Sequence, residues 1–205
     1  MERVSAVVLA GGRATRLGGV NKALLEVGGR RIIDRILDSL EPLVNQVLLV
    51  GHLAEGLDLP GVTVLADDYP GAGTLAAIHK GMLASGDGLC LAVGCDMPFL
   101  SRPLVERLLE LSEGWDVIVP RIGPHLEALH AVYRTDCLPV IEDAISRRQL
   151  KIIDFYTSVN IREVSEVEVR ALDPDLLSFF NINNPLDLER AQALVRAIPR
   201  VKAKE

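Results

Sequence analysis

Short apolar runs of strand length alternate with segments of helical periodicity, and this alternation restricts the possible folds more than any other feature of the chain. Residues 3–9 form a run rich in Val that leads into a pair of glycines, and residues 32–40 then repeat Ile and Leu at helical spacing. Parallel strands need crossover connections, which are usually helices that cover the sheet. We therefore predict an α/β fold with a three-layer, Rossmann-like, mostly parallel sheet and helices on both faces.

The remaining apolar segments extend the same pattern. Further strands are predicted at residues 46–50, 62–66, 89–93, 116–119, 129–133 and 179–182. Further helices are predicted at residues 75–83 with Thr74 as N-cap, at 104–111 with Ser101 as N-cap, at 137–147, and after Asn184-Pro185. Residues 151–172 have no pattern that assigns them.

Length and composition exclude several classes of protein. The 205 residues suit one domain, which we place at residues 1–199, followed by a charged tail at 200–205 that we expect to fray. The net charge is −6 and no basic stripe occurs, so neither nucleic acid nor a membrane is an expected partner. Three cysteines without a Cys-x-x-Cys spacing argue against a disulfide framework and a zinc site, which fits a cytoplasmic location.

A glycine-rich loop follows the first predicted strand directly. Gly11 and Gly12 would let the backbone approach a ligand closely and present N–H groups to it. Arg16 and Lys22 could then neutralise a triphosphate. The loop is not a Walker A motif, because no Ser or Thr follows Lys22. The alternative is a flexible turn with two solvated cations, and the combined spacing favours the nucleotide loop.

A carboxylate ends the strand predicted at residues 89–93. Asp96 stands at the edge of the sheet, followed by Pro98, which would fix the turn. Mg²⁺ commonly binds one or two carboxylates together with phosphate oxygens. The alternative is that Asp96 only caps the following turn, but the nearby glycine-rich loop favours the metal.

An asparagine-rich segment precedes the last predicted helix. Asn184 before Pro185 is typical of an N-cap and a first helical turn. In a strand, Asn181 and Asn183 would lie on the same side, and either could give a neutral oxygen to the metal. We select Asn183 as the second metal ligand, with helix entry alone as the alternative.

A second glycine-containing loop joins the strand predicted at 62–66 to the helix predicted at 75–83. Asp67 could accept a hydrogen bond from a base or ribose. Gly73 and Thr74 could contact a substrate through backbone amides at the start of the helix. The alternative is a loop and cap without ligand.

These motifs together resemble the molybdenum cofactor guanylyltransferase family over nearly the whole chain. The opening motif alone is similar to the wider nucleotidyltransferase superfamily, and the later motifs narrow the match. The matching segments are Leu9-Ala10-Gly11-Gly12 with Arg16-Leu17-Gly18 and Lys22, Gly73-Thr74-Leu75-Ala76, Cys95-Asp96-Met97-Pro98, Leu129-His130-Ala131-Val132-Tyr133-Arg134, and Asn181-Ile182-Asn183-Asn184-Pro185.

The resemblance implies a GT-A-like fold and transfer of GMP from GTP to the terminal phosphate of molybdopterin, with release of pyrophosphate. It implies that Asp96 binds both GTP and Mg²⁺. Molybdoenzymes or cofactor-delivery proteins are the protein partners that it would allow. By position, the other residues implied to contact the guanine nucleotide are Leu9, Ala10, Gly11, Lys22 and Asp67.

Three positions depart from the family pattern, and one bears on the choice of nucleotide. Leu17 replaces a frequent Met, and Asn21 a common Asp. Val50 stands where relatives often have an Asn near the nucleotide, so CTP stays open as the donor beside GTP. A sugar-phosphate nucleotidyltransferase would also carry the opening motif, and a regulator could keep it to bind nucleotide without catalysis. In each of the enzymes we expect Arg16, Lys22 and Asp96 to stabilise the charge that develops during transfer.

Overall fold

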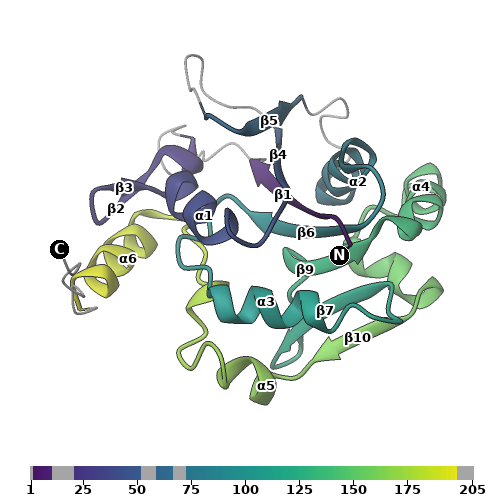
Figure 1. Cartoon of the computed structure of the whole chain (residues 1–205). Coiled ribbons are helices and arrows are strands. Elements are labelled where there is room, and N and C mark those ends of the chain that lie inside the picture. Colours follow the sequence, from purple (N-terminus) through teal and green to yellow (C-terminus); the bar gives the residue numbers. More distant parts are fainter. Residues whose placement is uncertain (1, 11–20, 52–58, 67–72, 198–205) are drawn as a thin grey trace.

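The computed structural model describes residues 2–10, 21–51, 59–66 and 73–197, and its centre is a mixed sheet (Figure 1). The strands follow the order β10-β7-β9-β6-β1-β4-β5, and β8 pairs with β7. β9 runs antiparallel to β6 and β7, and the other pairs on this path are parallel. The strands are β1 (Val4–Ala10), β4 (Gln46–Gly51), β5 (Val62–Leu65), β6 (Leu89–Gly94), β7 (Val117–Ile122), β8 (His125–Leu126), β9 (His130–Arg134) and β10 (Ile161–Val164). The predicted α/β sheet is thereby confirmed.

Helices cover both faces of the sheet because successive side chains of a strand alternate between them. Ala6 and Val8 of β1 join the hydrophobic cluster under α1 and α3, whereas Val7 and Leu9 join the cluster under α2 and α4. Gly81 lets α2 approach β1 closely, because a Cβ there would lie 2.3 Å from a methyl group of Val7. The helices are α1 (Ile32–Leu40), α2 (Gly73–Ser85), α3 (Arg102–Glu110), α4 (Leu138–Ser146), α5 (Glu166–Arg170) and α6 (Pro185–Ala197).

The order of the strands reverses beside β1. The chain runs from β1 to β4 and β5 on one side, and then returns to β6 on the other side of β1. The carboxyl ends of β1 and β6 therefore flank the point at which parallel α/β sheets leave a crevice for ligands. The fold alone thus points to residues that follow these two strands.

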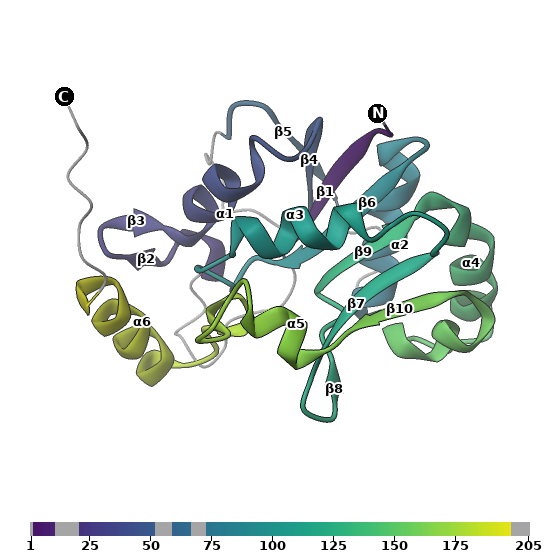
Figure 2. The same cartoon turned by 60° about the horizontal axis from the view of Figure 1, so that its bottom comes forward.

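The last helix packs at one end of the molecule beside a small hairpin of β2 (Glu26–Val27) and β3 (Arg30–Arg31) (Figure 2). Gln192 of α6 holds this hairpin through both ends of its amide. It donates to the carbonyl of Glu26 at 2.7 Å and accepts from the N–H of Gly28 at 3.1 Å. Helix α6 is thereby anchored to the hairpin.

Two local predictions at this level are wrong. The strand expected at 179–182 is a 3₁₀ turn, η5 (Leu177–Phe179), followed by extended residues that are not part of any strand in the described structure. The carboxylate of Asp173 accepts the N–H groups of Leu177 and Ser178, and this fixes the turn. Thr74, expected as an N-cap, lies inside α2, because that helix already begins at Gly73.

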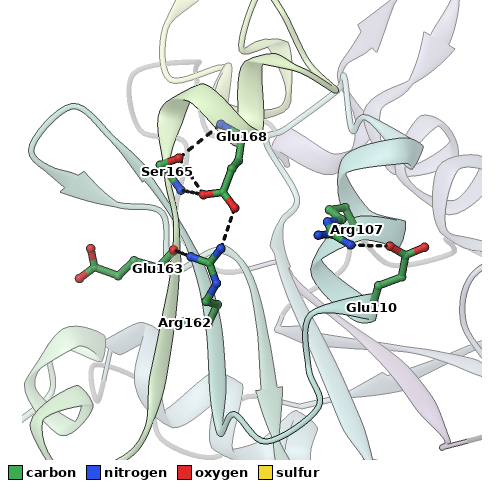
Figure 3. A network of polar contacts seen from close by, with 6 residues as sticks. All are labelled: Arg107, Glu110, Arg162, Glu163, Ser165 and Glu168. Carbon is green, nitrogen blue, oxygen red and sulfur yellow. Dashed lines mark hydrogen bonds and ion pairs between the residues drawn. The ribbon is translucent and has the colours of Figure 1, made fainter.

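The segment that no sequence pattern assigns contains a 3₁₀ helix η4 (Ile152–Ser158), the edge strand β10 and the short helix α5. A capping box starts α5: Ser165 Oγ accepts the N–H of Glu168, and the Glu168 carboxylate accepts the N–H of Ser165 at 2.9 Å (Figure 3). Arg162 donates to the same carboxylate at 2.6 Å. On neighbouring α3, Arg107 and Glu110 form a separate pair.

The helix at α3 follows its prediction. Ser101 is the N-cap, and its hydroxyl accepts the N–H of Leu104. None of the described helices is both long enough and apolar enough to span a bilayer. Residues 200–205, the expected tail, lie outside the described residues.

Candidate active site

Lys22 lies between two oxygen atoms from distant parts of the chain. Its Nζ donates to Asp96 Oδ2 at 2.9 Å and to Asn183 Oδ1 at 2.7 Å. Lys22 follows β1 and Asp96 follows β6, so the three side chains meet at the predicted edge of the sheet. The structure therefore brings together three of the predicted site residues, separated by 74 and 161 positions in the sequence.

A 3₁₀ turn, η2 (Lys22–Leu24), holds the lysine in place. The side chain of Asn21 caps this turn by accepting the N–H of Ala23 at 3.0 Å. An Asp at position 21 could accept the same bond, so the departure from the common family residue keeps this local structure. Ala23 is fully buried in the core, which anchors the turn next to the sheet.

The carboxylate of Asp96 sits on a turn with little free space. Cys95 N–H donates to the carbonyl of Leu9 at 3.1 Å, which extends the pairing of β6 with β1 beyond the strand end. A Cβ on Gly94 would lie 2.8 Å from Asp96 Oδ1. The glycine thus leaves room for the carboxylate to turn toward Lys22. Burial and the adjacent Asp96 raise the pKa of the Cys95 thiol to about 12, so it stays protonated and is no nucleophile at neutral pH.

Two contacts that sequence analysis missed hold Asn183 in position. The N–H of Ile182 donates to the carbonyl of Asp96 at 3.0 Å. The carboxylate of Asp187 accepts the N–H of Asn183 at 2.9 Å, while Asn184 caps α6 by accepting the N–H of Asp187. The pattern Asn-x-x-Asp at the helix start is a readable signal for this reciprocal cap.

The structure separates the two asparagines that the sequence offers as metal ligands. Asn183 points to Lys22, whereas the side-chain amide of Asn181 donates to the carbonyl of Phe179 at 3.2 Å. Because the segment is not a strand, the expected placement on one side does not apply. Of the two, Asn183 is the one that bonds to Lys22, and its role as a metal ligand stays a prediction.

The other predicted site residues fall into two groups. Leu9 and Ala10 end β1 with buried side chains, so only their backbone could face a nucleotide. Gly73 and Thr74 are exposed at the start of α2, and in the described structure no hydrogen bond or ion pair joins them to Lys22, Asp96 or Asn183. The residues that lie outside the described part are Gly11, Gly12, Arg16 and Asp67.

The oxygen atoms around Lys22 are of a kind that a divalent cation could bind. One carboxylate and one amide oxygen converge on a single positive charge, and hard oxygen donors of this kind suit Mg²⁺. Within the described ranges, no three His, Cys, Asp or Glu residues gather as metal ligands. A site with so few protein donors fits an ion that completes its shell with phosphate oxygens and water.

His130 lies close to this region but serves packing. It is fully buried on β9, its ring centroid lies 5.1 Å from that of Phe179, and neither ring nitrogen has a hydrogen-bond partner in the described structure. Burial lowers the pKa of His130 to about 4, so the ring is neutral at pH 7. This agrees with the packing role that the absence of a metal-binding spacing suggests.

Val50 is the residue for which the sequence leaves CTP open as a donor beside GTP. It pairs with Leu9 across β1 and β4, and its apolar side chain is buried in the cluster under α2.

The sheet and the residues at its switch point define the class: this is a nucleotidyltransferase with a GT-A-like fold. The family model of the MobA-like NTP transferase domain matches residues 6–159. The chain belongs to this family and is an enzyme of the nucleotidyltransferase class.

Relatives support this assignment over nearly the whole chain. A protein of Pelotomaculum thermopropionicum, named as a probable molybdenum cofactor guanylyltransferase, is 42% identical over 95% of this chain and 94% of its own length. A molybdenum cofactor guanylyltransferase of Desulfosudis oleivorans is 36% identical over 96% and 98%. The crystal structure of molybdopterin-guanine dinucleotide biosynthesis protein A from Archaeoglobus fulgidus matches with a TM-score of 0.80 and 29% identity, covering 94% of this chain and 98% of that one.

Proposed function

We propose that this enzyme transfers GMP from GTP to the terminal phosphate of molybdopterin, releasing pyrophosphate, with Mg²⁺ as its cofactor. The observation that carries the proposal is the convergence of Lys22, Asp96 and Asn183 at the switch point of the sheet. The names of the two curated relatives support guanylyl transfer in molybdenum cofactor biosynthesis. Three buried free cysteines fit the cytoplasm as the place of this reaction.

The chain's residues divide the work of binding. The backbone of the opening loop, through Leu9, Ala10, Gly11 and Gly12, would bind the nucleotide, and Asp67 would accept a hydrogen bond from its base or ribose. Gly73 and Thr74 would contact a substrate through backbone amides at the start of α2. These assignments rest on position in the sequence and on the resemblance to the family.

The chemical step needs positioning and charge neutralisation. An oxygen of the molybdopterin phosphate attacks the α-phosphorus of GTP in line, a new P–O bond forms, and the bond from the α-phosphorus to the bridging oxygen breaks so that pyrophosphate leaves. The attacking oxygen is already anionic, so no general base is required. Lys22 and Arg16 would donate to the triphosphate and stabilise the charge that grows on the leaving group.

Asp96 and Asn183 would hold the divalent cation. Nucleotidyl transfer of this kind generally uses such an ion, which neutralises phosphate oxygens when it is bound. The ammonium group between these two side chains indicates that a cation is stable at this point. The proposed ligands and the proposed ion therefore agree in charge and in donor type.

Pyrophosphate release is the direct test. The enzyme is incubated with molybdopterin, Mg²⁺ and either GTP or CTP, and pyrophosphate is measured by a coupled assay. We expect release with GTP and a higher melting temperature with GTP than with CTP. Release with CTP alone would favour cytidylyl transfer, for which Val50 is the motivating residue. Release only when a sugar phosphate replaces molybdopterin, or no release with any triphosphate, would contradict the proposal.

A further inference from the structure

Two hydrogen-bond acceptors face one another across Lys22. Asp96 Oδ2 and Asn183 Oδ1 are both within 2.9 Å of the same Nζ atom, and a carboxylate and an amide oxygen cannot bond directly to each other. The lysine and aspartate side chains are only 16% and 22% exposed, so solvent screens the pair only in part. A positive charge at this point therefore stabilises the two oxygens next to each other, in addition to the bond from the N–H of Ile182 to the carbonyl of Asp96.

The same two oxygens are the proposed ligands of the divalent cation. Mg²⁺ binds oxygen at about 2.0–2.1 Å, and it would need the lone pairs that Lys22 now uses. Two cations held by the same oxygens would also lie within roughly 4 Å of each other and repel. Lys22 and the divalent ion are thus alternative occupants of one position.

We infer that Lys22 takes the place of the divalent cation in the nucleotide-free enzyme, and that the ion binds Asp96 and Asn183 only after a triphosphate has drawn Lys22 away. A triphosphate bound as proposed offers the ammonium group new anionic acceptors. The lysine then exchanges the carboxylate of Asp96 for phosphate oxygens, so it keeps a negatively charged partner. This inference rests on the proposed function, which assigns Asp96 and Asn183 as the ligands of the divalent cation.

The exchange makes nucleotide and cation binding cooperative. A divalent ion alone must displace Lys22 into water, whereas a nucleotide lets Lys22 leave in exchange for phosphate contacts. In the nucleotide-free enzyme, the lysine bridges the side chains of Asp96 and Asn183, whose backbones are already joined through the N–H of Ile182. The nucleotide-free enzyme would thus bind bare divalent ions weakly, while the side chains of Asp96 and Asn183 stay in place to bind the ion later.

Binding of Mn²⁺, detected through the electron paramagnetic resonance signal of the free ion, tests the exchange without catalysis. Without nucleotide, we expect Lys22→Met to bind Mn²⁺ about tenfold more tightly than the wild type, because the competing charge is gone. Lys22→Gln serves as the second variant if the first does not fold, as judged by circular dichroism. Lys22→Arg keeps the charge and should bind Mn²⁺ as weakly as the wild type.

Two controls assign the gain to this site. Lys151 is exposed and lies outside the cluster, so Lys151→Met makes the same change in net charge and should leave Mn²⁺ affinity unchanged. The double variant Lys22→Met with Asp96→Asn should lose the gain. If Lys22→Met and Lys22→Gln bind Mn²⁺ no better than the wild type, or if the gain survives Asp96→Asn, the inference is wrong.

A GTP analogue with a methylene group between the α- and β-phosphorus completes the test. It should raise the Mn²⁺ affinity of the wild type by at least about tenfold, and by less in Lys22→Met, whose site is already open. The Asp96→Asn variant with the analogue measures the Mn²⁺ held by the nucleotide alone. Equal wild-type affinity with and without the analogue would overturn the inference. Failure of pyrophosphate release would instead contradict the proposed function and leave the nucleotide-free comparison valid.

Discussion

Two polar clusters of similar chemistry differ in the parts of the chain that they join. At the start of α5, Arg162, Ser165 and Glu168 lie within six positions of each other. At the sheet edge, Lys22 bonds to residues 74 and 161 positions away. The first cluster caps a helix, so its polar groups serve local structure. In the described part of the chain, the bonds of Lys22 to Asp96 and Asn183 cap no helix, and we propose that these charges serve a ligand.

The largest expected effect tests the cluster of Lys22, Asp96 and Asn183, whose members lie far apart in the sequence. We expect Asp96→Ala to lower kcat/KM for GTP by about two to four orders of magnitude, because the proposed ion loses its charged ligand. The fold should persist, since the side chain lies at the edge of the sheet and Lys22 can turn toward water. Pyrophosphate release and circular dichroism measure the two effects. Near-normal transfer by this variant would show that Asp96 does not bind the metal.

A smaller effect compares a glycine beside the candidate site, Gly94, with a glycine in the core, Gly81. In Gly94→Ala the added methyl would lie 2.8 Å from Asp96 Oδ1. The carboxylate can rotate away, so we expect about a tenfold loss in kcat/KM, a higher Mg²⁺ requirement and little change in melting temperature.

The matched variant Gly81→Ala meets the side chain of Val7 at 2.3 Å in the core between α2 and β1. Overpacking there should lower the free energy of unfolding by about 1–3 kcal/mol with little effect on the chemical step. Thermal melting and steady-state kinetics separate the two results. The same loss of stability in both variants would refute the contrast.

The smallest effect is expected in the cluster of Arg162, Ser165 and Glu168 at the start of α5. Ser165→Ala removes the helix cap and should lower the free energy of unfolding by about 1 kcal/mol, with kcat/KM unchanged. Bonds from Ser165, together with Arg162, lower the pKa of the Glu168 carboxyl. The stability from this cap is therefore present above the ordinary Glu pKa and is lost as the pH falls through the lowered value. Urea unfolding at neutral and acid pH measures it; altered kcat/KM would link α5 to the site.

The apolar pattern predicted most of the sheet because buried parallel strands are continuous runs of Val, Leu and Ala. Lys22, Asp96 and Asn183 were predicted from their motifs: the glycine-rich loop, the carboxylate after a strand and the asparagine-rich segment before the last helix. The proximity of these three residues is confirmed by the hydrogen bonds that join them. The roles of Gly11, Gly12, Arg16 and Asp67 stay predictions, because they lie outside the described residues.

The errors arose where a side chain that binds nearby backbone N–H groups overrides the apolar pattern. The apolar residues around Phe179 are typical of a strand, but Asp173 binds the backbone N–H groups just before them and turns the chain. Helix α5 has five residues, too few to show helical periodicity, although Ser165-x-x-Glu168 is a capping pattern. For helices as short as α5, the capping pattern is therefore a better predictor than helical periodicity.

The bond from Ile182 to the carbonyl of Asp96 has a consequence for how the enzyme is made. A ribosome delivers β1, β6 and the aspartate long before it delivers Asn183. A nascent chain that ends at α4 already contains the central strands. It still lacks Asn183, whose amide oxygen is one of the two proposed ligands of the cation. Competence for nucleotide chemistry would then arise late in synthesis, when the sheet is already in place to receive the arriving segment.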